Sequence, residues 1–530
     1  MKLKALALVA AVLMTASCFA ACSKKEETSS TPSTPDASSE GGETSSDEGG
    51  ETASTEHQQI EITSTPVTEL DYMATSADTS EAVNLLWYLW GDPHEDDQMV
   101  FDKLNEMSAA DINTTVDFKY ADDTKAGLMI STDEYYDMVF SCAWQANYVN
   151  NANKGVFAEL DELLPTVAPT LYNFLPELIW EGATVNGHIY GVPVYKDSAA
   201  AQMYVIDKSL AEEAGITQDD MNALTSNWAD FTPLLQKLKD NTDLEGVEAP
   251  YMTTGTAIND EFDYINRSGM GVGIPFGSSD NKVISALDDP TTLDTVTVFK
   301  EWLDTGLANK DALTAETNGG WSPAWTQQGW LNCEAFWKNN DHGDVMISTR
   351  IPAMYTTDYV LGSAHAISVN SDYVERALLY LQWINCNSEA RNIFCYGIEG
   401  THWNKTDEGT VERTDRGAAK YNASSFSQGT FFTVIPEAPK ALDSWDGLLK
   451  SCMEATATPL LGFTPNNEMI ENEISSVSAI AAQYERALRV GAVDDPAAAI
   501  AEAREGVMSA GLQAIIDEYQ TQVDEFMASK

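Results

Sequence analysis

Residues 84–153 alternate between short apolar runs and amphipathic segments, and this order constrains the fold more than any other feature of the sequence. Each apolar run has the length of a buried strand, and each following segment places apolar residues at helical spacing. The expected strands cover 84–90 (NLLWYLW), 114–120 and 137–140, and the expected helices include Val100 to Met107, Thr124 to Ile130 and Gln145 to Asn153. A strand–helix order repeated three times predicts a parallel sheet with helices on its faces, and so an α/β fold.

Two tryptophans stand where these expected strands end. Trp90 closes the first strand, directly before the turn Gly91-Asp92-Pro93, and Trp144 comes soon after the third strand. In open sheets with parallel strands, ligands bind outside the carboxyl ends of the strands. The sequence therefore predicts a ligand site with both tryptophans at its mouth.

The body of the chain extends from about Ile60 to Lys530. The sequence is 43% hydrophobic overall, and a body of this length is too long for a single core, which predicts two lobes or domains. Helical periodicity returns near the C-terminus, where 474–488 and 512–526 each place apolar residues along one face. No apolar run in this body approaches the length of a membrane span.

The N-terminus is typical of a secretory signal peptide, expected to cover residues 1–21. Lys2 and Lys4 precede an apolar run from Leu6 to Met14 that is too short to span a bilayer stably. Small residues follow, and Phe19-Ala20-Ala21-Cys22 resembles a lipobox, in which Cys22 takes the lipid and becomes the first residue. Cys18 is a second candidate for acylation.

A polar tether is expected from residue 22 to residue 59. Residues 23–59 contain no large aliphatic or aromatic side chain, so this segment cannot bury enough surface to fold. A flexible chain of that length spans about 30–36 Å. The lipid and the tether together predict a protein held at the cell surface, on the outer face of the cytoplasmic membrane.

Acidic residues dominate the charge, with 82 acids against 30 bases and a net charge of −52. Such a chain has no basic stripe to displace phosphate counterions, which argues against nucleic acid as a partner and disfavours polyanionic ligands. The cysteines of the body are odd in number and form no CxxC pair, which predicts reduced, mostly buried thiols, with a Cys386–Cys395 bridge left open. These cysteines are Cys142, Cys333, Cys386, Cys395 and Cys452.

The order of several short segments resembles one protein family, the extracellular solute-binding lipoproteins of carbohydrate ABC importers (family 1 type). The segments that carry the resemblance are 136–140 with Trp144, 155–161 (GVFAELD), 185–193 (VNGHIYGVP), 366–371, 375–377 and 396–400. Near the end, 459–463 (PLLGF) and the helix from Glu473 to Val490 are similar to the C-terminal domain of a Gram-positive subgroup. The resemblance covers nearly all of residues 80–530.

The resemblance implies a two-lobed, periplasmic-binding-protein-like (type II) α/β fold, with a hinge and an inter-lobe cleft that closes around the ligand. Lobe 1 would hold 60–200 and 362–400, and lobe 2 would hold 201–361 and 401–530 with the helical C-terminal region. The strands crossing between the lobes would fall near 195–202, 359–365 and 398–403. The family further implies a monomer without a cofactor that delivers a sugar to the transmembrane subunits of an ABC permease.

The residues agree with a sugar or oligosaccharide as ligand. Sugars have apolar C–H faces and rims of hydroxyl groups, so aromatic rings beside planar polar side chains bind them. The candidate ligand-binding residues are Trp90 with Asp92, Trp144 with Gln145, Tyr195 with Asp197, Trp325, and Trp403 with Glu399.

An enzyme is the main rival interpretation. No HExxH, GxSxG or P-loop motif occurs, so no catalytic residue is predicted. His402 near Glu399 is interpreted as a hinge-region hydrogen bond, and Asp92, Asp96 and Asp97 as an acidic helix start without metal. A surface glycoside hydrolase stays open because two carboxylates suffice for that reaction. A peptide-binding lipoprotein on the same scaffold also stays open, because a fold alone does not choose its ligand.

Overall fold

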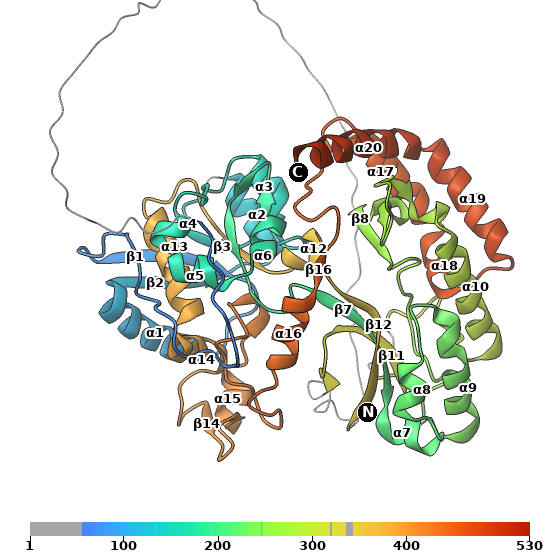
Figure 1. Cartoon of the computed structure of the whole chain (residues 1–530), viewed down its shortest axis with the longest axis horizontal. Coiled ribbons are helices and arrows are strands. Elements are labelled where there is room, and N and C mark those ends of the chain that lie inside the picture. The colour runs from blue at the N-terminus through green and yellow to red at the C-terminus, as the bar shows by residue number, and fades with distance from the viewer. Residues whose placement is uncertain (1–55, 133, 245, 318–320, 335–342) are drawn as a thin grey trace, which may run out of the picture. The chain divides into compact units, whose positions relative to one another are not determined.

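The computed structural model describes residues 56–132, 134–244, 246–317, 321–334 and 343–530 (Figure 1). The predicted signal peptide and the lipidation site Cys22 lie outside these residues, as does most of the predicted tether. Within the described ranges, no helix combines the length and the apolar character needed to cross a membrane.

The first sheet has five strands in the order β2-β1-β3-β13-β6. β1 pairs in parallel with β2 and β3, as expected, whereas β13 is antiparallel to both β3 and β6. Its strands are β1 (Val83–Leu89), β2 (Thr114–Tyr120), β3 (Met138–Phe140), β6 (Gly191–Pro193) and β13 (Ala364–Ile367). The early helices are α1 (Asp97–Ile112), α2 (Asp123–Ser131), α3 (Tyr148–Asn153), α4 (Leu164–Val167), α5 (Pro169–Phe174) and α6 (Glu177–Gly182), with the hairpin β4 (Thr184–Val185) and β5 (His188–Ile189) after them.

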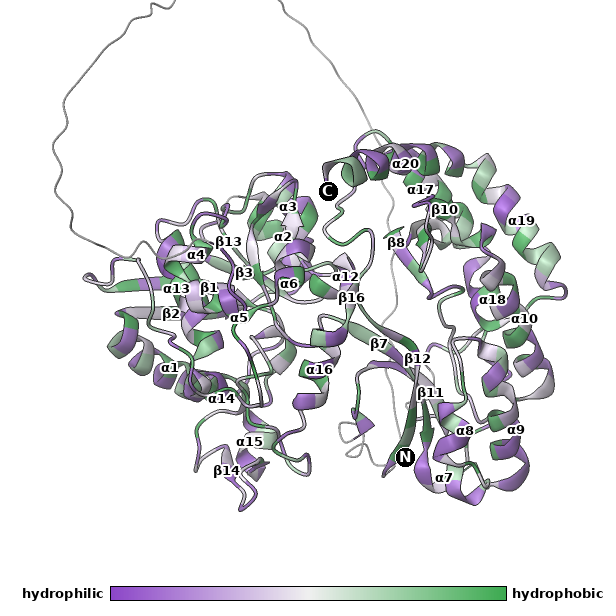
Figure 2. Ribbon diagram, in the orientation of Figure 1, coloured by the Kyte–Doolittle hydropathy of each residue, from purple (hydrophilic) through white to green (hydrophobic). Residues whose placement is uncertain are grey.

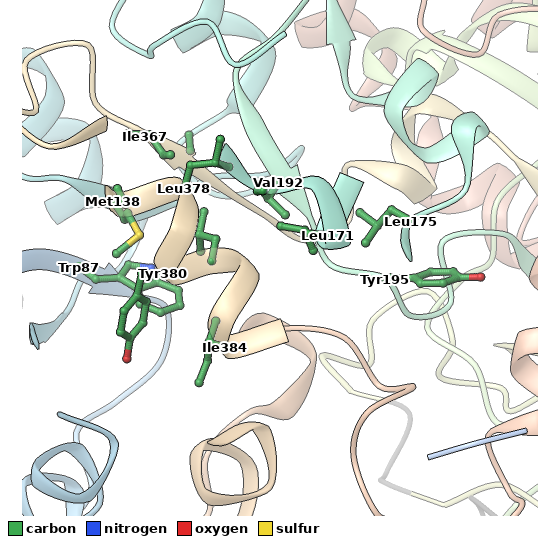
Figure 3. Close-up of a cluster of buried hydrophobic side chains, with 14 of the residues drawn as sticks. Trp87, Met138, Leu171, Leu175, Val192, Tyr195, Ile367, Leu378, Tyr380 and Ile384 are labelled. Atoms are coloured by element: carbon green, nitrogen blue, oxygen red, sulfur yellow. The ribbon is translucent and has the colours of Figure 1, made fainter. Parts of the chain in front are cut away.

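Helix α13 (Val374–Cys386) forms the centre of the core of this lobe. Every residue of α13 from Arg376 to Cys386 is buried, so the helix is covered on all sides. Figure 3 shows its side chains Leu378, Tyr380 and Ile384 among Trp87 of β1, Met138 of β3 and Ile367 of β13.

The second lobe contains a sheet in the order β11-β7-β12-β16, with helices that bury Trp228 and Trp302 against it. Its strands are β7 (Ala200–Asp207), β11 (Ala324–Gly329), β12 (Val345–Tyr355) and β16 (Thr456–Ala457). Its helices are α7 (Lys208–Glu213), α8 (Gln218–Asn222), η1 (Trp228–Phe231), α9 (Thr232–Asn241), η3 (Ala286–Asp288) and α10 (Pro290–Thr305).

A separate apolar cluster joins a small sheet, in the order β10-β9-β8, to the C-terminal helices. Val477, Ile515, Tyr519 and Val523 are buried in it, which confirms the apolar faces expected from the sequence, and Figure 2 shows both polar and apolar residues along α19 and α20. The predicted helix from Glu473 to Val490 is divided in two. The elements are β8 (Phe262–Asn266), η2 (Ser268–Met270), β9 (Val272–Pro275), β10 (Ile284–Ser285), α17 (Glu471–Ala481), α18 (Glu485–Val490), α19 (Pro496–Ser509) and α20 (Leu512–Ser529).

The chain passes between the lobes at three places. Residues 195–199 lead into β7, and β12 leads back to β13 through α12 (Thr357–Val360). The third crossing is β16, which pairs in parallel with the end of β12, and not the segment 398–403 that the sequence suggested. Residues 401–454, assigned to lobe 2 from the sequence, instead pack on lobe 1. They form β14 (Trp403–Lys405), β15 (Val411–Arg413), α15 (Asp415–Lys420), η4 (Ser425–Ser427) and α16 (Asp446–Glu454), after α14 (Ser388–Tyr396).

A buried arginine explains this placement. Arg391 in α14 has no exposed surface, and a buried guanidinium needs an acceptor for each of its donors. Carbonyl oxygens of Ser425, Gly429 and Thr430 and the side chain of Gln428 supply them at 2.9–3.2 Å. The segment is therefore held on lobe 1 by polar contacts that hydropathy does not reveal.

Candidate functional site

Trp90 and Trp144 meet at the carboxyl edge of the first sheet, as the strand order predicted. Their ring centroids lie 5.3 Å apart, with the planes at 88°. Trp144 is 49% exposed, and its indole N–H donates to the carbonyl oxygen of Gly362 at 2.9 Å. Trp90 is half-buried, with its ring against Phe140 and Phe426. The pair forms an aromatic corner whose outer ring is held in orientation and open to solvent.

The polar neighbours of these tryptophans have different surroundings. Gln145 is only 3% exposed, and its amide donates to the carbonyl oxygen of Ala121 at 2.9 Å, so it supports the loop rather than facing solvent. Asp92 is exposed in the turn after Trp90. Of the two, only Asp92 has a side chain that a ligand can reach.

Asp197 belongs to a polar group at the crossing strands. Its carboxylate pairs with the ammonium group of Lys196 and accepts a hydrogen bond from the amide of Gln328 at 2.6 Å. Gln328 of β11 lies directly opposite Gln202 of β7, whose amide donates to the hydroxyl of Tyr359 at 3.0 Å. Amide, carboxylate and hydroxyl groups from lobe 2 and from two crossing segments therefore lie close together here.

Gln202, Gln328 and Tyr359 were not predicted as site residues. Gln202 and Tyr359 fall within the crossings near 195–202 and 359–365 that the resemblance implied, and the signal for Gln328 is the pair of adjacent glutamines in the stretch AWTQQG of β11. Trp325, on the same strand, is half-buried, and its indole N–H donates to Gln327 at 3.1 Å.

Tyr195 and Trp403 lie in cores. Tyr195 is 1% exposed, its ring packs against Phe432 at 4.4 Å, and burial raises its pKa well above its usual value. Figure 3 shows it at one end of the lobe 1 cluster. Trp403 is 4% exposed and donates its indole N–H to the carbonyl oxygen of Gly397. Rings covered to this extent cannot act as platforms for a sugar, whereas Glu399 is exposed.

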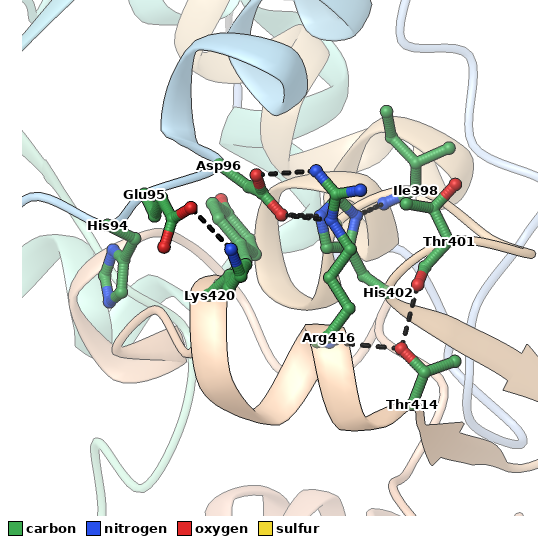
Figure 4. A network of polar contacts seen from close by, with 12 residues as sticks. His94, Glu95, Asp96, Ile398, Thr401, His402, Thr414, Arg416 and Lys420 are labelled. Atoms are coloured by element: carbon green, nitrogen blue, oxygen red, sulfur yellow. Dashed lines mark hydrogen bonds and ion pairs between the residues drawn. The ribbon is translucent and has the colours of Figure 1, made fainter.

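His402 is part of a buried clasp and does not form a pair with Glu399 (Figure 4). Its Nδ1 accepts from the backbone N–H of Ile398 at 2.9 Å, so Nε2 carries the proton and donates to Asp96 at 3.1 Å. Arg416 donates to both oxygens of Asp96, at 2.6 and 2.8 Å, and holds the pKa of that carboxyl well below its usual range. The clasp fixes the loop between Trp90 and α1 to the segment 398–421.

The five cysteines of the described body are free and buried, as the sequence predicted, and the Cys386–Cys395 bridge does not form. Among the described residues, no three His, Cys, Asp or Glu side chains come together in the manner of metal ligands.

Comparison with known proteins finds similarity to transport proteins. Residues 459–528 match a domain of unknown function, DUF3502. A carbohydrate ABC transporter substrate-binding protein of Streptococcus pneumoniae serotype 4 is 26% identical over 474 residues, which is 86% of this chain and 93% of the relative. The chain is therefore similar, over most of its length, to a substrate-binding protein of a carbohydrate ABC transporter.

Solved structures share the two-lobed fold of this chain. The N-glycan transport solute-binding protein NgtS of Streptococcus pneumoniae has a TM-score of 0.76 at 24% identity, over 84% of this chain and 99% of that one. The same protein in complex with Man1GlcNAc has a TM-score of 0.68 at 23% identity, over 84% and 100% of the two chains. Its complex with Man5GlcNAc has a TM-score of 0.65 at 24% identity, over 84% and 99%.

Proposed function

We propose that this protein is the extracellular, lipid-anchored component of an ABC importer, and that it captures a neutral oligosaccharide for the membrane permease. The observations that carry the proposal are the exposed aromatic corner of Trp90 and Trp144 and the polar group of Asp197, Gln202 and Gln328. The kinship with a carbohydrate-transport relative supports it.

The chemistry of this arrangement suits a sugar. The C–H face of a pyranose stacks on an indole ring, and its hydroxyl groups both donate and accept hydrogen bonds. Glutamine amides and the carboxylate of Asp197 offer both kinds of partner within the crossing strands. A neutral ligand fits the net charge of −52, because a polyanion would be repelled.

Closure of the lobes around the ligand is part of the proposal. NgtS resembles this chain more in the structure named without a glycan (TM-score 0.76) than in the two glycan complexes (0.68 and 0.65), at nearly constant identity. Such a decrease in TM-score is expected if this chain has its lobes open and the glycan complexes have them closed, because hinge closure moves each lobe as a rigid body. We infer that the protein acts as a monomer and is not an enzyme.

Calorimetry with a panel of neutral glycans, Man5GlcNAc among them, tests the ligand class. Trp144→Ala should weaken the tightest-binding glycan by about 10- to 100-fold, roughly 1.4 to 2.7 kcal/mol. The matched control is Tyr373→Ala, an aromatic that is 42% exposed and precedes α13 at the opposite edge of the sheet. Binding of peptides but of no glycan would overturn the ligand class, and release of sugar products would overturn the non-enzymatic role.

The anchor is tested by fractionation of the cells. Cys22→Ser should move the protein from the membrane fraction to the medium, because a tether without lipid has no apolar surface to hold it. Cys18→Ser is the control and should leave the protein on the membrane. Release by Cys18→Ser alone would move the acylation site to Cys18.

A further inference from the structure

A cavity lies within lobe 2, next to the hydrogen bond between Gln202 and Tyr359. It has a volume of about 330 Å³, at the small end of ligand pockets, which range over roughly 300–1,000 Å³. Its walls come from β7, β8, β11, the segment before β8 and the hinge residues 356–359, and none belongs to the first sheet. The polar residues that the argument uses are Gln202, Thr256, Asp260, Asp263, Arg267 and Asp358.

Asp260 is held rigidly at this cavity by a buried arginine. Arg350 is 3% exposed, pairs with the carboxylate of Asp260 and donates to the carbonyl oxygen of Ser226 at 3.0 Å. Its guanidinium also lies over the ring of Trp228 at 4.3 Å. Asp260 itself keeps 27% of its side chain exposed, so one buried residue positions an accessible acceptor.

Unpartnered polar atoms surround the same cavity. Asp263 lines it and is 6% exposed, and no described residue bonds its Oδ2. Thr256 Oγ1, in the wall, is also buried without a hydrogen-bond partner in the described part of the chain, as is Nδ2 of Asn259, which precedes Asp260 in sequence but does not line the cavity. Buried polar groups in native proteins nearly always have partners, so a cluster of exceptions at one cavity indicates a polar occupant.

The charges around the cavity select the kind of occupant. Arg267 pairs with Asp358 at 3.1 Å and Arg350 pairs with Asp260, so both guanidinium groups are already matched. Arg267 is the cation that acts on Asp263, and it is shared with Asp358, which leaves the cavity with an excess of negative charge. Burial raises the pKa of Asp263 to about 6 and outweighs Thr458, the backbone of Leu460 and the charge of Arg267, which all act in the opposite direction. An anionic sugar would be repelled, and a neutral one would not.

We infer that this cavity is a subsite for one neutral sugar unit of the oligosaccharide, whose hydroxyl groups donate hydrogen bonds to Asp260 and Asp263. The inference rests on the proposed function and sharpens it, because it excludes oligosaccharides that end in a uronic or sialic acid. The aromatic corner would bind the C–H face of one unit, and this subsite would read the hydroxyl groups of another.

The test uses the full-length protein and the neutral glycan of the panel that binds the wild type most tightly. The same glycan, with its terminal primary hydroxyl group oxidised to a carboxylate, is the second probe. At pH 7.5 the oxidised glycan should bind at least 10-fold more weakly to the wild type. Asp260→Asn and Asp263→Asn should each weaken the neutral glycan by about 10- to 100-fold and reduce the discrimination against the oxidised one.

Glu261→Gln is the matched control. This variant also removes one negative charge, at the position between Asp260 and Phe262. Because Glu261 does not line the cavity, the affinities for the neutral and the oxidised glycan should both be unchanged. Gln202→Ala gives a third lining variant if an aspartate variant fails to fold. Lining variants that bind like the wild type, together with a weakened Trp144→Ala, would overturn the subsite and leave the proposed function standing. Failure of every neutral glycan to bind the wild type would overturn both.

Discussion

Replacing Asp263 by asparagine should make the protein more stable at neutral pH, although it removes a predicted ligand contact. Asp263 is 6% exposed on β8, its Oδ2 has no partner among the described residues, and burial raises its pKa to about 6. A carboxylate in such a place pays a desolvation cost that an uncharged amide of the same shape does not.

The magnitude follows from the pKa of Asp263 in the two states. The folded value of about 6 exceeds the ordinary value of 3.8, so the folded protein binds the proton more tightly than the unfolded chain. The free energy of unfolding therefore falls as the pH rises from about 4 to about 6, and by pH 7 the loss is about 3 kcal/mol. The asparagine amide needs partners of its own, so we expect a net gain of about 1 to 3 kcal/mol.

Thermal unfolding of the wild type, Asp263→Asn and Glu261→Gln between pH 4 and pH 7.5 measures this difference. If the body unfolds as one unit, the variant should melt roughly 1–3 °C above the wild type at pH 7.5, and the two should converge at pH 4. Glu261→Gln removes the same net charge and should follow the wild type. A difference that does not change with pH, or a destabilised variant at pH 7.5, would refute the account of Asp263 as a carboxylate destabilised by burial.

Three further predictions concern other buried groups of the body. Arg416→Ala should lower the melting temperature at pH 7, because Asp96 loses both charge-assisted hydrogen bonds. The pKa of Asp96 is depressed in the folded state, so the stabilisation is present above pH 4 and lost below it, and the melting temperatures of variant and wild type should converge in acid. Tyr195→Ala should lower the free energy of unfolding by about 3–5 kcal/mol, whereas Tyr195→Phe, which keeps the ring, should lower it far less. Chemical denaturation measures both values, and an equal loss of stability in the two variants would contradict a packing role. The body cysteines should resist thiol reagents in the native protein and react on unfolding, because they are buried and burial raises the pKa of their thiols, to about 11 for Cys142 and to about 12 for Cys333 and Cys452. Mass spectrometry of labelled peptides measures this, and rapid labelling of the native protein would contradict it.

The sequence alone determined the parallel part of the first sheet, β2-β1-β3, and the aromatic corner. The strands β1, β2 and β3 could be predicted because each is a short apolar run bounded by turns, and their parallel pairing followed from the helices between them. Adjacent parallel strands end at the same edge of a sheet, so Trp90 and Trp144 had to meet. These inferences depend on local periodicity and chain connectivity, which a sequence displays directly.

Only the tertiary structure decided which aromatic rings are covered and where the chain crosses between the lobes. Tyr195 and Trp403 resemble Trp144 in sequence context, yet their burial depends on Phe432 and Gly397, which their own sequence neighbourhoods do not reveal. β16 is two exposed residues long and has no hydropathy signal, so its crossing could not be predicted. The cavity in lobe 2 joins segments that lie more than a hundred residues apart, and such an assembly exists only once the packed core has brought them together.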